Sequence, residues 1–197
     1  MWAVVGLGNP GRRYVHTRHN AGFSLVRRVA KAWNVRVKKT AFHSKITYAE
    51  RWGKTILLAM PQTYMNKSGL AVKLIVDSGG VLLAHLVLVY DDLDIPLGEI
   101  RIREEGGAGS HKGMRSVIEE LNSRRFTRIR IGIGPLPAEG EATEFVLTPF
   151  SAEETLLFKR GLEMAEKALE YILAEETEKA MTLFNQRPQS ESNSGLP

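Results

Sequence analysis

Residues 4–22 read V-V-G-L-G-N-P-G-R-R-Y-V-H-T-R-H-N-A-G. The apolar run that opens this stretch, residues 2–7, ends near a glycine turn, which is typical of a buried strand that enters a βα loop. A helix follows, because apolar residues recur at the spacing of one helical face, at Leu25, Val26, Val29, Ala30 and Trp33. A strand, a loop and a helix in this order indicate an α/β fold.

The loop of this unit carries a histidine among arginines. His19 lies close in sequence to Arg12, Arg13 and Arg18. Histidine is the side chain best suited to proton transfer near neutral pH, and guanidinium groups suit contacts with phosphate. The stretch therefore indicates hydrolysis beside a bound polyanion.

The rest of the chain continues to alternate strands and helices. Strands are expected within residues 35–60, at 86–90, at Glu99–Arg103 and at 128–134, and helices from Asn66, over 112–122 and over 151–177. Asn66 is assigned as a helix N-cap because its side chain can accept a hydrogen bond from the first turn. This order predicts a single-domain, three-layer α/β sandwich over residues 1–185, with a mixed, largely parallel, twisted sheet flanked by helices. Residues 186–197 have too few apolar side chains to bury and are expected to be a disordered tail.

The composition is that of a soluble globular protein, with 43% hydrophobic and 25% charged residues among 197. Cysteine is absent, which excludes disulfides, thiolate metal sites and cysteine nucleophiles. No apolar run has membrane-spanning length and no secretory signal precedes the first strand, so a cytoplasmic protein without membrane contact is expected.

The net charge of +5 hides a strong asymmetry along the chain. Residues 1–54 hold twelve Lys or Arg and a single acid, Glu50, a balance of +11. Residues 138–178 hold eleven glutamates against three basic residues, a balance of −8. A nucleic acid would therefore be attracted to one side of the protein only.

The glycines of the first loop also have the spacing of a dinucleotide-binding motif, at Gly6, Gly8 and Gly11. That motif needs an acid about 20 residues further on to hold the ribose, and residues 24–40 contain none. We interpret the glycines as a tight turn that lets a backbone or a substrate approach closely.

Water is the expected nucleophile, because the sequence lacks a G-x-S-x-G elbow, an H-E-x-x-H pair and a G-x-x-x-x-G-K loop. Attack of water on an ester needs a base, a carboxylate that fixes the tautomer of the base, and donors for the oxyanion. The candidates are His19 as base, one of Asp91, Asp92 and Asp94 as carboxylate, and the amides Asn9, Asn20 and Asn66 as donors. A metal shared by His16 and His19 is not expected, because no third ligand has a supporting spacing. The remaining histidines, His43, His85 and His111, are interpreted as structural or surface residues.

Six motifs follow one another along the chain. They are G-L-G-N-P-G-x-x-Y (Gly6 to Tyr14), T-R-H-N-x-G (Thr17 to Gly22), Y-M-N-x-S-G (Tyr64 to Gly69), D-D-L-D (Asp91 to Asp94), G-S-H-x-G (Gly109 to Gly113) and R-I-G-I-G (Arg130 to Gly134). With these motifs, residues 2–185 resemble the bacterial-type peptidyl-tRNA hydrolases.

The resemblance implies a monomeric α/β enzyme, without a metal or organic cofactor, that cleaves the ester between peptide and tRNA and recycles tRNA from stalled or aborted translation. It implies that His19 activates water and that Asp91 holds His19 in its basic form. Asn9 would contact the peptide main chain and help to distinguish an N-blocked substrate from a free aminoacyl-tRNA. Asn66 would bind the ester end of the substrate, and Tyr14, Tyr64 and Met65 would line the same cleft.

Lys112 departs from the family pattern, which usually has an asparagine that grips the substrate here. A lysine can donate hydrogen bonds and could pair with a terminal phosphate of the tRNA, but it cannot accept a hydrogen bond as an amide does. A second departure is Arg27, where the family often has an acid. Two alternatives stay open: a non-catalytic RNA-binding relative, which only Lys112 favours, and a nucleotide-dependent oxidoreductase, which only the glycine spacing favours.

Overall fold

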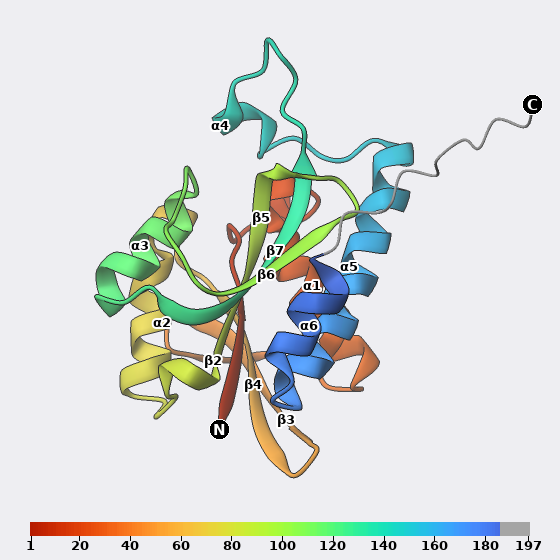
Figure 1. Cartoon of the computed structure of the whole chain (residues 1–197). Coiled ribbons are helices and arrows are strands. Elements are labelled where there is room, and N and C mark those ends of the chain that lie inside the picture. Colours follow the sequence, from red (N-terminus) through yellow and green to blue (C-terminus); the bar gives the residue numbers. More distant parts are fainter. Residues whose placement is uncertain (186–197) are drawn as a thin grey trace, which may run out of the picture.

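The computed structural model describes residues 1–185 and consists of a mixed sheet between two layers of helices (Figure 1). In spatial order the strands are β2 (Lys39–Ala41), β3 (Ser44–Arg51), β4 (Lys54–Pro61), β1 (Trp2–Gly6), β5 (Leu86–Pro96), β7 (Arg125–Gly134) and β6 (Ile100–Glu105). The central strands β4, β1, β5 and β7 run parallel, whereas β2–β3, β3–β4 and β6–β7 are antiparallel pairs. The predicted α/β sandwich is confirmed, and the predicted tail, residues 186–197, lies outside the described residues.

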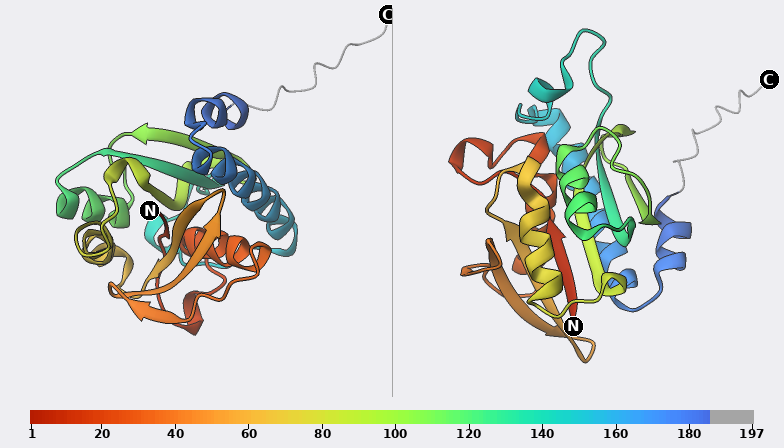
Figure 2. Two further views of the ribbon diagram at one scale, coloured as in Figure 1. Left: turned by 90° about the horizontal axis from the view of Figure 1, so that it is seen from below. Right: turned by 90° about the vertical axis from the view of Figure 1, so that its left-hand side faces the viewer.

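Helices cover both faces of this sheet (Figures 1 and 2). One layer consists of α1 (Ala21–Ala32), α5 (Ala152–Leu173) and α6 (Thr177–Phe184), and the other of α2 (Ser68–Asp77) and α3 (Lys112–Leu121). Shorter helical segments are η1 (Arg12–Tyr14), η2 (Arg18–Asn20), η3 (Met65–Lys67), η4 (Leu83–His85) and α4 (Ala142–Phe145). No helix in the described part of the chain is long and apolar enough to cross a membrane.

The central strand β1 is buried on both faces. Trp2 and Val4 pack in the hydrophobic cluster under α1 and α5, while Ala3 and Val5 pack in the cluster under α2 and α3. Side chains of a strand alternate between the two faces of its sheet, so a strand between two helical layers is apolar throughout. This explains the unbroken apolar run at the N-terminus.

Two glycines let α1 cross the sheet at very short range. A Cβ atom on Gly22 would lie 2.3 Å from the carbonyl oxygen of Val89, and one on Gly6 would lie 2.2 Å from the carbonyl oxygen of Gly22. The expected close backbone approach is confirmed. The Phe23 ring would lie 2.7 Å from a Cβ on Gly8, so α1 packs directly against this glycine as well. The contact also brings η2, directly before α1, against the end of β5.

The prediction of one continuous helix over residues 151–177 is wrong, because α5 ends at Leu173 and α6 begins separately at Thr177. Lys54 of β4 donates a hydrogen bond from Nζ to the carbonyl oxygen of Leu173 at 2.7 Å, and it pairs with Glu175 at 2.7 Å. Glu175 adopts a left-handed φ of 65°. A cation that binds the last carbonyl groups stabilises a helix end, so a residue distant in sequence sets this boundary.

The N-cap assigned to Asn66 is also wrong. Asn66 lies inside η3, and α2 begins at Ser68 with Lys67 in the N-cap position. The hydroxyl of Ser68 donates to the carbonyl oxygen of Met65 at 2.8 Å and closes this turn. Asn66 is exposed, and its side chain remains available to the cavity described below.

Candidate active site

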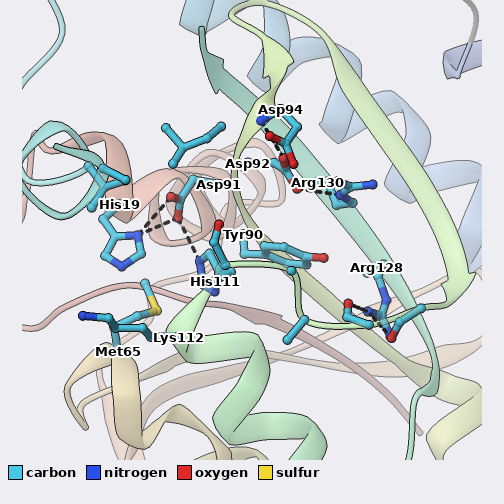
Figure 3. Close-up of a pocket in the computed structure, with 18 of the residues that line it drawn as sticks. His19, Met65, Tyr90, Asp91, Asp92, Asp94, His111, Lys112, Arg128 and Arg130 are labelled. Atoms are coloured by element: carbon cyan, nitrogen blue, oxygen red, sulfur yellow. Dashed lines mark hydrogen bonds and ion pairs between the residues drawn. The ribbon is translucent and has the colours of Figure 1, made fainter. Parts of the chain in front are cut away.

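A histidine and a buried aspartate meet just beyond the end of β1 (Figure 3). Nδ1 of His19, in η2, lies 3.0 and 2.9 Å from the two carboxylate oxygens of Asp91, in β5. Asp91 is 2% exposed. Of the three aspartates that the sequence left open, Asp91 is therefore the partner of His19.

Burial alone would raise the pKa of Asp91. The electrostatic attraction of His19 and His111, together with hydrogen bonds from both rings, outweighs burial and holds the pKa of Asp91 well below its ordinary value. Asp91 is consequently ionised at neutral pH. An ionised carboxylate only accepts hydrogen bonds, so each ring must present an N–H group to it.

His111 is the second ring bound to Asp91, which corrects its interpretation as a structural or surface residue. Its Nε2 lies 3.2 Å from Oδ1 of Asp91, and its Nδ1 accepts a hydrogen bond from the backbone N–H of Met114 at 3.1 Å. His111 is thus the N-cap of α3. Because Nδ1 is used as an acceptor, the proton of the neutral ring is on Nε2, and His111 donates to Asp91.

The two histidines therefore have fixed and different tautomers. His19 donates from Nδ1 to Asp91, which leaves the lone pair of its Nε2 free. Both nitrogens of His111 are engaged, one with Asp91 and one with Met114. Of this pair, His19 is the ring that can take a proton from a substrate or a water molecule without breaking an existing hydrogen bond.

The same cluster could also hold a metal ion, because His19, Asp91 and His111 offer ligand atoms within 4.8 Å of one another. With Asp91 ionised, each of the two rings donates an N–H group to it, and this arrangement suits proton transfer.

A network of amides holds Asn9 beside this cluster. The side chain of Asn20 accepts from the backbone N–H of Asn9 at 2.8 Å and donates to its carbonyl oxygen at 3.0 Å. Oδ1 of Asn9 accepts from the backbone N–H of Met65 at 2.8 Å. This bond fixes the orientation of the Asn9 amide, so its Nδ2 donor group is left for a ligand. Asn20 is buried, and both its amide nitrogen and its amide oxygen bind the backbone of Asn9, so it is no longer a candidate oxyanion donor.

These residues open onto a cavity of about 950 Å³. Seven of the eight residues predicted for the site line it: Asn9, His19, Tyr64, Met65, Asn66, Asp91 and Lys112. Tyr14 does not line the cavity, and its ring lies under the guanidinium of Arg13, 4.5 Å from the ring centroid. Tyr64 is 56% exposed and presents an aromatic face to solvent.

Comparison with known proteins identifies the family of this chain. The family model for peptidyl-tRNA hydrolase matches residues 3–193 of this chain. The chain belongs to the peptidyl-tRNA hydrolase family. It is 46% identical over 185 residues to the peptidyl-tRNA hydrolase of Carboxydothermus hydrogenoformans, covering 94% of this chain and 98% of that protein. It is 39% identical to that of Clostridium beijerinckii, covering 94% and 96%. The crystal structure of peptidyl-tRNA hydrolase from Acinetobacter baumannii superposes with a TM-score of 0.90 at 30% identity, covering 96% of this chain and 97% of the other.

The far end of the cavity in this peptidyl-tRNA hydrolase family member is lined by arginines. Nε of Arg130 donates to Oδ2 of Asp92 at 2.6 Å, which occupies the second candidate aspartate with an ion pair. Arg128 is 1% exposed and donates to the carbonyl oxygens of Gly106 and Gly107 at 3.0 and 3.1 Å. No local sequence signal distinguishes Arg128 from the other arginines of β7. Arg128 holds the glycine-rich loop that leads to His111.

A segment distant in sequence holds the backbone of the loop that carries His19. The N–H groups of Arg18 and His19 donate to the carbonyl oxygens of Thr148 and Val146 at 3.1 and 2.8 Å. The Arg18 side chain forms a bidentate ion pair with Glu154 at 2.8 Å and lies over the ring of Phe145. Arg18 was expected to contact phosphate, but it is 5% exposed and its charge is neutralised by Glu154.

Proposed function

We propose that this chain hydrolyses the ester between peptide and tRNA in peptidyl-tRNA, with His19 as the general base. The supporting observation is the free Nε2 of His19 beside a large cavity, with its other nitrogen held by the ionised Asp91. Family membership identifies the class of substrate. A cytoplasmic location, a monomeric state and a role in recycling tRNA belong to the same proposal.

The reaction needs a single proton carrier. His19 Nε2 removes a proton from water while the water oxygen bonds to the ester carbonyl carbon, and the carbonyl oxygen becomes an oxyanion. When this tetrahedral intermediate collapses, the bond to the ribose oxygen breaks, and the imidazolium of His19 returns its proton to that oxygen. Asp91 stabilises the imidazolium between the two steps. The products are a peptide acid and a tRNA with free hydroxyl groups.

Donors for the oxyanion come from the residues around the cavity. Asn9 Nδ2, the side chain of Asn66 and the ammonium of Lys112 are free to donate, since none of them has a hydrogen-bond partner among residues 1–185. Lys112 adds a positive charge where negative charge develops. Removing one such donor from an active site costs about 10²- to 10³-fold in rate.

Asn9 can also select an N-blocked substrate. In a peptidyl-tRNA the α-nitrogen is an amide whose neighbouring carbonyl accepts a hydrogen bond from Asn9 Nδ2. In a free aminoacyl-tRNA the same position is an ammonium group, which only donates, so two donors would face each other. Such repulsion is an efficient source of specificity.

The tRNA end of the substrate fits the part of the cavity that β5, β7 and β6 form. Arg103, Arg130 and Lys112 line this part and suit phosphate groups. The exposed ring of Tyr64 suits stacking of an unpaired terminal base. Arg130 already forms an ion pair with Asp92 through its Nε, so a phosphate would bind the other nitrogens of the same guanidinium group.

Substitution of His19 with alanine tests the proposal, with His16→Ala as the matched control. His16 is an exposed histidine three residues away that does not line the cavity. We expect His19→Ala to lose about 10²- to 10⁴-fold in hydrolysis of N-acetyl-aminoacyl-tRNA while tRNA affinity stays within about twofold. His16→Ala should retain both properties.

The alternative, a non-catalytic RNA-binding protein, predicts a different result in the same experiment. Wild-type protein would bind tRNA without cleaving the ester, and Lys112→Asn would then restore cleavage. Equal loss of turnover and tRNA affinity in His19→Ala would instead mean that His19 has a structural role.

A further inference from the structure

We infer that a second, basic groove beside the catalytic cavity binds acidic side chains of the nascent peptide. This rests on the proposed function. It adds a contribution of peptide sequence to substrate recognition, several residues away from the ester.

The groove has an apolar floor and a cationic rim. Its volume is about 640 Å³, within the range of pockets that hold small ligands. Val15, Phe23, Val35, Val37 and Met60 form apolar parts of its lining. Six cations complete it: Arg12, Arg27, Lys31, Arg36, Lys38 and Lys45. No acidic residue lines the groove among the residues that the structure describes.

These six cations are not neutralised by the protein itself. All six are exposed, and none forms an ion pair within residues 1–185. The neighbouring Arg28 differs, because it pairs with Glu166 at 2.6 Å and with Glu163 at 3.6 Å. The acidic face of α5 thus neutralises one side of α1, while the other side of α1 keeps its charge for a ligand.

The order of the strands places the groove on the peptide side of the ester. The groove is formed by α1 and by the loop and strand residues around β3 and β4, on one side of β1. The catalytic cavity continues from β1 to β5, β7 and β6, on the other side. Asn9, in the loop after β1, lines both. The acyl and ribose parts of an ester leave the carbonyl carbon in different directions, so a tRNA bound toward β6 sends the peptide past Asn9 toward β3.

The lining favours a peptide over RNA. The free Nδ2 of Asn9 at the junction suits a peptide carbonyl, and the floor offers apolar surface to side chains. A second stretch of RNA backbone would need no apolar floor. Aspartate and glutamate side chains fit both the apolar floor and the cationic rim, because their methylene groups are apolar and their carboxylates can pair with the cations of the rim.

Three substrates test the inference. The first is N-acetyl-aminoacyl-tRNA, which is too short to enter the groove. The second is a peptidyl-tRNA with glutamate at the third to sixth positions from the ester, roughly 10 to 20 Å along an extended chain. The third carries glutamine at the same positions, which keeps size and hydrogen bonding but removes the charge.

The variant is Arg36→Glu with Lys38→Glu, and the matched control is Lys159→Glu with Arg160→Glu on α5. Both pairs consist of one lysine and one arginine that are exposed and free of ion pairs within residues 1–185, but only the first pair lines the groove. The measured quantity is kcat/KM at low and at physiological salt.

We expect wild-type protein to prefer the glutamate peptide to the glutamine peptide by about tenfold at low salt, from two or three exposed charge contacts. Raising the salt should weaken this preference. The groove variant should lose or invert it and still cleave N-acetyl-aminoacyl-tRNA at the wild-type rate, and the α5 control should keep it.

Equal cleavage of both peptides by wild-type protein would overturn the inference. A groove variant that slows all three substrates alike would overturn it in favour of RNA binding in the groove. If wild-type protein cleaves none of the three, the proposed function itself fails, and this inference fails with it.

Discussion

Substitution of Asp91 with asparagine should invert the tautomer of His19. Asparagine has the shape of aspartate but offers one acceptor and one donor, whereas Asp91 accepts from two rings. The Met114 N–H holds His111 with its proton on Nε2, so the asparagine oxygen should turn toward His111. The amide donor then faces Nδ1 of His19 and moves the ring proton to Nε2, where the base is needed.

The size of the effect follows from the bonds that change. A hydrogen bond to a charged partner contributes about 1.5 to 3 kcal/mol, and the bond between His19 and Asp91 strengthens further as the imidazolium forms. Its loss, together with the wrong tautomer, should raise the barrier by about 3 to 5 kcal/mol. This corresponds to a fall of about 10²- to 10⁴-fold in the rate of hydrolysis.

The assay is single-turnover hydrolysis of N-acetyl-aminoacyl-tRNA, with tRNA affinity measured in parallel. A second substitution makes the test specific, namely His111→Asn, which can still cap α3 but removes the ring that competes for the asparagine oxygen. We expect the Asp91→Asn, His111→Asn double variant to be faster than Asp91→Asn alone, because the oxygen can turn to His19. A double variant as slow as the product of the two single effects would refute the assignment of tautomers.

Three further predictions concern the pH dependence, substrate selection and the fold. Because the pKa of Asp91 is lowered in the folded protein, its stabilising effect is complete above its unfolded pKa of about 3.9 and is lost as the pH falls toward the folded value. Thermal unfolding should therefore show wild-type protein losing stability relative to Asp91→Asn below about pH 4, and a constant difference between them would contradict this. Asn9→Asp keeps the acceptor for the Met65 N–H but replaces the free donor with an acceptor, so the ratio of kcat/KM for N-blocked over free aminoacyl-tRNA should fall by about tenfold or more; an unchanged ratio would remove Asn9 from substrate selection. Gly22→Ala places a methyl group 2.3 Å from the carbonyl oxygen of Val89 and should lower the free energy of unfolding in urea by about 1 to 3 kcal/mol or more, together with the activity; wild-type stability would show that the close approach can relax.

Local sequence patterns predicted most of the fold and the candidate base His19. The apolar run at residues 2–7, the periodic helix after it and the carboxylates after residues 86–90 each have a short-range signature. These signatures place His19 after the first strand and the three aspartates Asp91, Asp92 and Asp94 at the end of a neighbouring one, without choosing among the three. The motifs shared with the family added the choice of Asp91 and the residues Tyr64, Met65 and Lys112.

The features that the sequence did not predict depend on contacts between distant residues. His111 looks like a lone histidine in a glycine-rich loop, and only the packing of α3 against β5 brings it to Asp91. The sequence at the end of α5 has no glycine or proline that would predict a helix end. The end is capped instead by Lys54 from β4. Arg18 was expected to bind phosphate, but its charge is neutralised by an ion pair with Glu154, 136 residues away. Charge and motif therefore indicate the chemistry available, while tertiary contacts decide which groups remain free.

The most direct test of the central claim compares one tRNA in two forms, charged with an N-acetylated amino acid or with the free amino acid, and measures ester release under single-turnover conditions. A base at His19 and a donor at Asn9 predict rapid cleavage of the N-acetylated form alone. Tight tRNA binding without cleavage of either form would contradict the account and favour a non-catalytic tRNA-binding protein.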